Sequence, residues 1–157
     1  MSVENLEKIS DIFSIFHDGK IVFCHLENSS LLMEVEIRYL AERIDPAFRK
    51  FIIRLYDVKD LYFFPWPSDR SSEPDVLREI DTIFKPELEI LDANCEEDQI
   101  KVICTQHSLE LDYFGGELSL SATSAEVLDE AGKNYSIEEL DTLCKSYWDE
   151  WANQHKA

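Results

Sequence analysis

The chain has 157 residues, of which 45% are hydrophobic and 31% charged, and its formal net charge at pH 7 is -18. A single domain of this length buries about two-thirds of the surface of its unfolded chain, so we expect one core and one domain over residues 1–157. A strongly negative charge repels nucleic acid and anionic membrane surfaces, which argues against both as partners.

The sequence indicates a cytoplasmic location. It contains no run of about 18 apolar residues, and residues 1–5 lack the basic region and apolar stretch of a secretory signal. The cysteines are widely spaced and lie in apolar or helical segments, so we expect free thiols. They are Cys24, Cys95, Cys104 and Cys144.

The first predicted element is an amphipathic helix over residues 3–16. Its apolar residues recur at spacings of three and four, which places them on one face: Leu6, Ile9, Ile12, Phe13 and Phe16. Gly19, which follows His17 and Asp18, is expected to end this segment in the left-handed conformation.

Four strands are predicted next, over residues 21–26, 33–39, 51–56 and 61–64. The second of them alternates apolar and charged residues, as a strand with one buried face does. Because the connections are short, we expect the four strands to form one antiparallel meander. Proline at position 65 ends the last strand, a loop covers residues 67–74, and Ser72 is expected to cap a short helix.

A second meander is predicted from residues 88–91, 100–104, 109–113 and 118–122, with turns at residues 92–98, around His107 and at Gly115-Gly116. The last helix begins with a capping box in which Ser136 and Glu139 satisfy each other's backbone donors. The pattern predicts an α+β fold with seven to eight mainly antiparallel strands. The two meanders form a sandwich or a curved sheet, and the N-terminal and C-terminal helices pack on it.

No catalytic residues and no cofactor site are predicted. Cys24 and His25 are adjacent in a strand and point to opposite faces, and Cys104 and His107 are separated by an odd number of residues. No spacing typical of a zinc site occurs. Residues 92–98 contain five oxygen ligands in one loop. An EF-hand register nevertheless places Glu97 where glycine is required, which favours a solvated acidic turn over a calcium site.

The acidity is concentrated after Pro86. Residues 1–86 hold 16 acidic and 11 basic residues, whereas residues 87–157 hold 17 acidic and 4 basic residues and no arginine. The leading hypothesis is therefore a non-enzymatic acidic domain that binds a cationic protein. A narrower form is an immunity or inhibitor protein that neutralises a cationic toxin or nuclease. The expected binding residues are Glu96, Glu97, Asp98, Glu110, Asp112 and Glu117, with Tyr113 or Trp66 as the aromatic anchor.

Two alternatives remain open at this point. One is a small-ligand-binding domain or a hydrolase that uses carboxylates, with a divalent cation held by residues 92–98. The other is a homodimer in which the aromatic residues Tyr62, Phe64 and Trp66 are buried against a second copy. Packing into the chain's own core is the competing explanation for these aromatic residues.

Overall fold

The computed structural model describes residues 3–67 and 75–154, which form one open antiparallel sheet with helices packed on it. The helices are α1 (Leu6–Ile15), α2 (Arg38–Ala41), α3 (Ile80–Ile83) and α4 (Ile137–Gln154). The strands are β1 (Lys20–Glu27), β2 (Ser30–Glu36), β3 (Lys50–Tyr56), β4 (Lys59–Pro67), β5 (Leu88–Glu96), β6 (Gln99–Thr105), β7 (Tyr113–Ser121), β8 (Ser124–Leu128) and β9 (Asn134–Tyr135). The predicted α+β class is confirmed, with nine strands in a single sheet instead of a sandwich.

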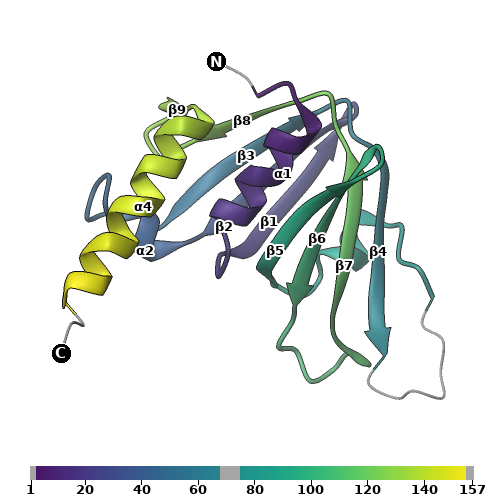
Figure 1. Ribbon diagram of the computed structural model, residues 1–157. Helices are drawn as coiled ribbons and strands as arrows, with labels where there is room; N and C mark the ends of the chain where they lie inside the picture. The colour runs from purple at the N-terminus through teal and green to yellow at the C-terminus, as the bar shows by residue number, and fades with distance from the viewer. Residues whose placement is uncertain (1–2, 68–74, 155–157) are drawn as a thin grey trace.

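The strand order is β4-β7-β6-β5-β1-β2-β3-β8-β9, and the pairing at its centre is short. There β1 and β5 share only two residue pairs, Lys20 with Glu89 and Ile21 with Leu88. The strands on either side of this junction are seen at different angles in Figure 1, so the sheet is strongly curved. Helix α1 lies across the middle of the sheet, with α4 beside it (Figure 1).

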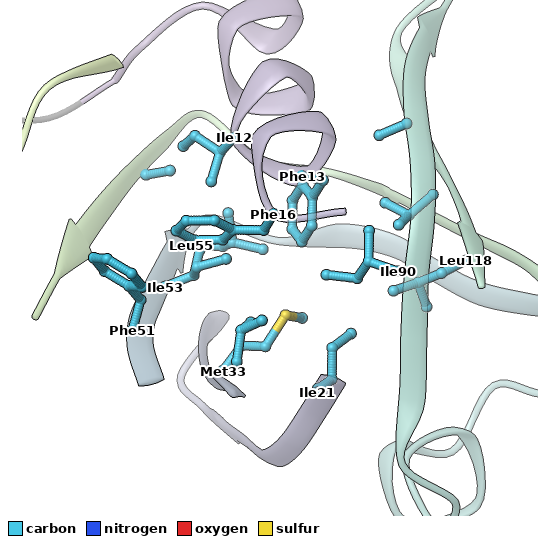
Figure 2. Packing of buried hydrophobic residues seen from close by; sticks show 14 of the residues in the cluster. Ile12, Phe13, Phe16, Ile21, Met33, Phe51, Ile53, Leu55, Ile90 and Leu118 are labelled. Atoms are coloured by element: carbon cyan, nitrogen blue, oxygen red, sulfur yellow. The ribbon is translucent and has the colours of Figure 1, made fainter. Parts of the chain in front are cut away.

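The core lies between α1 and the curved sheet. Phe13 and Phe16 point from α1 toward Ile90 of β5 and Leu55 of β3, as Figure 2 shows. These side chains are fully buried, so α1 joins the two halves that the β1–β5 pairing holds only weakly. The predicted helix is thus confirmed as a core helix over Leu6–Ile15, whereas Val3 pairs with Ala125 of β8 instead of belonging to it.

The turn after α1 differs from the prediction. The left-handed residue is Asp18, with φ of 71°, while Gly19 has no positive φ. Glycine is required at position 19 for space instead, because a Cβ there would lie 2.8 Å from Cγ1 of Val35. Strand β2 also ends earlier than predicted, at Glu36, and Tyr39 lies in α2.

The predicted first meander is wrong in its last strand. Strands β1, β2 and β3 pair in sequence, but β4 pairs with β7 at the far edge of the sheet, where Phe63 lies opposite Leu118. The free side of β3 is taken by β8, which was not predicted. Left-handed backbone at Asp57 and Asp60 marks the connection through which the chain leaves β3. The expected cap at Ser72 lies outside the described residues.

The second meander has three strands, β5, β6 and β7. The predicted strand 109–113 is a loop up to residue 112, and Gly115-Gly116 lies inside β7 instead of at a turn. Both positions require glycine because a neighbouring backbone lies close. A Cβ at position 115 would lie 2.4 Å from the Cys104 oxygen, and a Cβ at position 116 would lie 2.5 Å from the Phe64 oxygen. The predicted loop 92–98 is mostly strand, because β5 continues to Glu96 and turns sharply at Glu97.

The capping box of α4 is confirmed. The backbone N–H of Glu139 donates to Oγ of Ser136 and the backbone N–H of Ser136 donates to Oε1 of Glu139, both at 3.1 Å. The bond from the Ser136 backbone lowers the pKa of the Glu139 carboxyl. No helix within the described ranges has the length and apolarity needed to cross a membrane.

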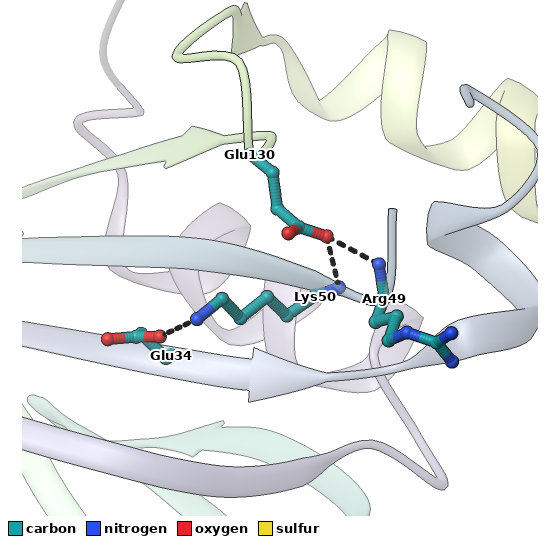
Figure 3. A network of polar contacts seen from close by, with 4 residues as sticks. All are labelled: Glu34, Arg49, Lys50 and Glu130. Atoms are coloured by element: carbon teal, nitrogen blue, oxygen red, sulfur yellow. Dashed lines mark hydrogen bonds and ion pairs between the residues drawn. The ribbon is translucent and has the colours of Figure 1, made fainter. Parts of the chain in front are cut away.

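A carboxylate ties the connection between β8 and β9 to the start of β3. Oε2 of Glu130 accepts the backbone N–H groups of Arg49 and Lys50, and the Lys50 ammonium in turn bonds to Glu34 of β2 (Figure 3). These hydrogen bonds and the ion pair join segments that are distant in the sequence. They stabilise the half of the sheet that carries α4.

Short segments pair with strands β4 and β8, near the two sides of the sheet. Phe63 of β4 exchanges two backbone hydrogen bonds with Leu77, and Pro65, which faces the same edge, has no N–H to donate. At the opposite side, Val3 pairs with Ala125 of β8. At the β4 edge the pairing with Leu77 and the proline disfavour the addition of a partner strand.

Candidate functional site

The outward face of β4, β7 and β6 combines aromatic and polar side chains. Along each strand side chains alternate between faces, and Phe63, Leu118 and Val102 point into the core. Their neighbours point the opposite way. The residues of this outward face are Tyr62, Phe64 and Trp66 of β4, Gly115, Glu117 and Ser119 of β7, and Lys101, Ile103 and Thr105 of β6.

The pairing register arranges these residues in rows across the three strands. Trp66 lies opposite Gly115, Phe64 opposite Glu117 and Tyr62 opposite Ser119. Strand β6 continues the same rows in the same order with Thr105, Ile103 and Lys101. The aromatic residues therefore form one border of the face, and the polar side chains of β7 and β6 lie beside them.

Lys101 is the best-ordered charged group on this face. Its Nζ donates to Oε1 of Gln99 and Oγ of Ser119, both at 3.0 Å, and lies 3.6 Å from Oε1 of Glu117. The ammonium also lies 5.7 Å from the centroid of the Phe64 ring, a cation–π distance. The side chain of Lys101 is only 16% exposed, and its ammonium makes these contacts within the protein.

The loop between β6 and β7 is held by Gln106, which is 3% exposed. Its Nε2 donates to the carbonyl oxygens of Ser108, at 3.1 Å, and of Tyr113, while its Oε1 accepts the Ser108 N–H at 2.6 Å. Its own N–H donates to the Phe114 oxygen at 2.8 Å. One buried amide thus satisfies three backbone groups and links the two ends of the loop over residues 107–112.

This ordered loop presents apolar side chains to solvent. Leu109 is 95% exposed and Phe114 68%, and Trp66 at the end of β4 is 46% exposed. Glu110 and Asp112 are exposed beside them. In Figure 1 the loop lies next to the end of β4, so these residues gather at one end of the sheet. We call Trp66, Leu109, Glu110, Asp112 and Phe114 the apolar-acidic surface.

The structure separates the residues expected from sequence into two groups. Trp66, Glu110 and Asp112 lie on the apolar-acidic surface, and Glu117 is on the adjoining sheet face. The acidic residues at positions 96–98 form the hairpin turn between β5 and β6, at the opposite end of β6 from the loop. The predicted binding residues therefore do not form one continuous interface.

Of the two expected aromatic anchors, Tyr113 belongs to the core. It is 9% exposed and its ring centroid lies 5.7 Å from that of Phe63, while burial raises the pKa of its phenol. The sequence pattern predicts one alternating strand over residues 109–113. It does not indicate that residues 109–112 form a loop and that β7 begins only at Tyr113. Trp66 is therefore the exposed member of the pair.

Sequence reasoning missed Gln106, Leu109 and Lys101. An isolated Lys between apolar residues and a Gln before a His carry no local signal, because their roles depend on partners from other strands. Leu109 and Leu111 looked like one face of a strand. In the folded chain Leu111 packs against the core and Leu109 does not.

The cysteines show no reactive arrangement. All four are free thiols, and burial raises the pKa of both Cys24 and Cys104 to about 12, which favours the unreactive protonated form. Across the described ranges no three His, Cys, Asp or Glu side chains are grouped to hold a metal ion. Asp92, Asn94 and Glu96 lie within the extended strand β5, whereas a calcium site uses a loop.

Comparison of the chain with protein-family models, with curated proteins and with solved structures finds no match. The fold and the surface described above define the protein as an acidic α+β domain with a curved, nine-stranded antiparallel sheet. Any functional proposal therefore depends on the chemistry of its surface.

Proposed function

We propose that this protein is a non-enzymatic binding domain whose apolar-acidic surface docks a cationic protein. The observation that carries the proposal is Leu109, which is 95% exposed on a loop that a buried glutamine holds in place. Single exposed leucines are ordinary on protein surfaces. Here Leu109, Phe114 and Trp66 are all exposed at the same end of the sheet, and Glu110 and Asp112 are exposed next to the leucine along the chain.

The loop is suited to binding because it is already ordered. Immobilising a free loop on binding costs free energy, and each rotamer-rich side chain adds about 0.5–1.5 kcal/mol. The hydrogen bonds of Gln106 to Ser108 and Tyr113 meet part of this cost within the folded protein. Aromatic anchors surrounded by polar residues are also the usual composition of interface centres.

The charge of the protein supports a cationic partner. A net charge of -18 produces a long-range attraction for basic proteins, and Glu110 and Asp112 supply carboxylates at the surface itself. In the narrower form of the proposal the partner is a cationic toxin or nuclease. The carboxylates then occupy the basic surface that otherwise binds phosphates, and the enzyme is inhibited.

A pair of matched charge-reversal variants tests the proposal. The loop variant carries Glu110→Lys and Asp112→Lys, and the control carries Glu96→Lys and Glu97→Lys, so both change the net charge equally. We expect affinity capture from the native cell extract to recover a basic protein with the wild type and the control, and to lose it with the loop variant. Equal loss with both variants, or capture that neither variant changes, contradicts a specific role for this surface.

The narrower form has its own readout. If the captured protein is a nuclease, stoichiometric addition of the domain should abolish cleavage, and the loop variant should restore it. Capture without inhibition leaves the binding function intact and rejects the inhibitor role.

A further inference from the structure

Two outward-facing aromatic residues of β4, Tyr62 and Phe64, each lie beside a positively charged side chain. The Arg78 guanidinium lies 4.8 Å from the centroid of the Tyr62 ring, and the Lys101 ammonium lies 5.7 Å from that of Phe64. Both distances are within the roughly 6 Å at which a cation is attracted by the negative face of an aromatic ring. Two successive outward rings of one strand therefore each hold a positive group from this chain.

Trp66 is the third ring on this side of β4. Within residues 3–67 and 75–154 no cation lies over its indole. Tryptophan is the strongest cation–π acceptor among the aromatic residues, and this one is half-exposed at the end of the strand. Its neighbour in register is Gly115, which has no side chain to cover the indole from β7.

Carboxylates lie on the same face as Trp66. Glu117 is its diagonal neighbour on β7, at a typical Cα distance of about 7–8 Å. Farther along the row, beyond Gly115 and Thr105, lies Glu89 of β5, which bonds to Thr105 Oγ1 at 3.3 Å. The backbone of Lys101 lies two rows away from Trp66, but its ammonium reaches over the Phe64 ring and lies 3.6 Å from Oε1 of Glu117, so this carboxylate already pairs with one cation of the chain.

We propose that Trp66 receives the head group of an arginine side chain from the partner, and that Glu117, whose Oε1 pairs with Lys101, shares its carboxylate with that arginine. The partner's arginine then lies over the third outward ring of β4, as Arg78 lies over Tyr62 and Lys101 over Phe64. A planar guanidinium stacks on an aromatic face and pairs with a carboxylate, which a lysine ammonium does less well. This inference rests on the proposed function, because it names the chemical group that the acidic domain recognises.

The indole N–H signals of Trp66, Trp148 and Trp151 provide a test in nuclear magnetic resonance. The probe is N-acetyl-arginine amide, titrated to tens of millimolar at low salt, and the comparison compound is the uncharged citrulline analogue. We expect the Trp66 signal to shift with arginine and not with citrulline, while the signals of Trp148 and Trp151 move little. Trp66→Leu identifies the signal by removing it.

A second series measures the contribution to partner binding. Trp66→Leu should weaken affinity for the captured basic protein about two- to fivefold, the range of an exposed cation–π contact, and Trp66→Phe should weaken it less. Phe23→Leu is the matched control, because Phe23 is an exposed aromatic residue of β1 that lies outside the apolar-acidic surface.

Two outcomes overturn the inference. One is an equal shift of all three indole signals, or the same shift with citrulline. The other is an unchanged affinity in Trp66→Leu. If either occurs while the Glu110→Lys and Asp112→Lys variant still loses the partner, the inference fails and the proposed function stands. If that variant keeps the partner, the proposed function fails by itself.

Discussion

The imidazole of His17 stacks on the indole of Trp148, with ring centroids 5.7 Å apart and planes inclined by 15°. This contact joins the end of α1 to the second half of α4. Tyr39 of α2 extends the cluster, because its hydroxyl donates to the His17 carbonyl at 2.9 Å and its ring lies 4.5 Å from that of Tyr147. Leu140 is the one fully buried side chain of α4, so beyond its first turns the helix is held by this aromatic cluster together with Arg43, which pairs with Glu150 at 2.8 Å.

We therefore expect Trp148→Ala to release the second half of α4. The loss of the stacking contacts and part of the buried area should cost about 1–2 kcal/mol of unfolding free energy. Amide hydrogen exchange should accelerate after Leu143 and remain slow near Leu140. Leu109→Ala is the control, since its side chain is almost fully exposed and its removal should change stability by less than about 0.5 kcal/mol. Equal effects of both substitutions contradict the attachment.

The second prediction concerns Asp129, whose carboxylate organises the turn before β9. It accepts the N–H groups of Ala131 at 2.8 Å and Lys133 at 3.0 Å and the hydroxyl of Tyr135 at 2.7 Å. Burial opposes ionisation, but the bonds from Tyr135 and the backbone prevail and hold the pKa of Asp129 below its usual value. A lowered pKa adds stability that is present above about pH 4 and is lost as pH falls through the folded-state pKa.

Asp129→Asn should therefore reduce stability at pH 7 by about 1–3 kcal/mol. The difference between this variant and the wild type should shrink as pH falls below about 4, because the wild-type carboxyl then becomes protonated. Urea unfolding between pH 7 and pH 2.5 measures it. A difference that does not change with pH would contradict the assigned role of the charge.

The third prediction concerns Gln106. Replacing it with Leu removes the partners of Ser108 and Tyr113 while keeping an apolar volume of similar size, so buried backbone groups lose their hydrogen bonds. A cost of about 1–3 kcal/mol is expected, with faster exchange of the amides in residues 107–112. His107→Leu, at an exposed neighbouring position, should leave that exchange unchanged. Partner affinity should fall in Gln106→Leu even though no interface side chain is altered.

The fourth prediction contrasts two glycines. Gly115→Ala places a Cβ 2.4 Å from the Cys104 oxygen, so β6 and β7 must separate and we expect a loss of more than about 2 kcal/mol. Gly132→Ala meets nothing within 4 Å, and its cost arises from a φ of 87°, at about 1–2 kcal/mol. Thermal unfolding should rank Gly115→Ala below Gly132→Ala. The reverse order would contradict close strand approach at Gly115.

Much of the fold could be predicted because its signals are local. The helix at residues 3–16 and the capping box at Ser136 and Glu139 depend on neighbours within one or two turns, and both predictions are confirmed. The alternation of residues 33–36 likewise indicates which side chains are buried, whatever strand lies alongside. Strand partners are different. Phe63 pairs with Leu118, far along the chain, and nothing in residues 61–64 indicates that choice.

By itself the sequence determined the fold class, the terminal helices and the surplus of negative charge, since these follow from periodicity, capping and composition. Tertiary structure alone decided which residues meet at the surface. In the folded chain β4 lies beside β7, Tyr113 is buried in the core, and Trp66 lies at the same end of the sheet as the loop that carries Leu109. The physical reason is that local patterns set which face of an element is apolar, whereas the packing of distant elements decides which faces become neighbours.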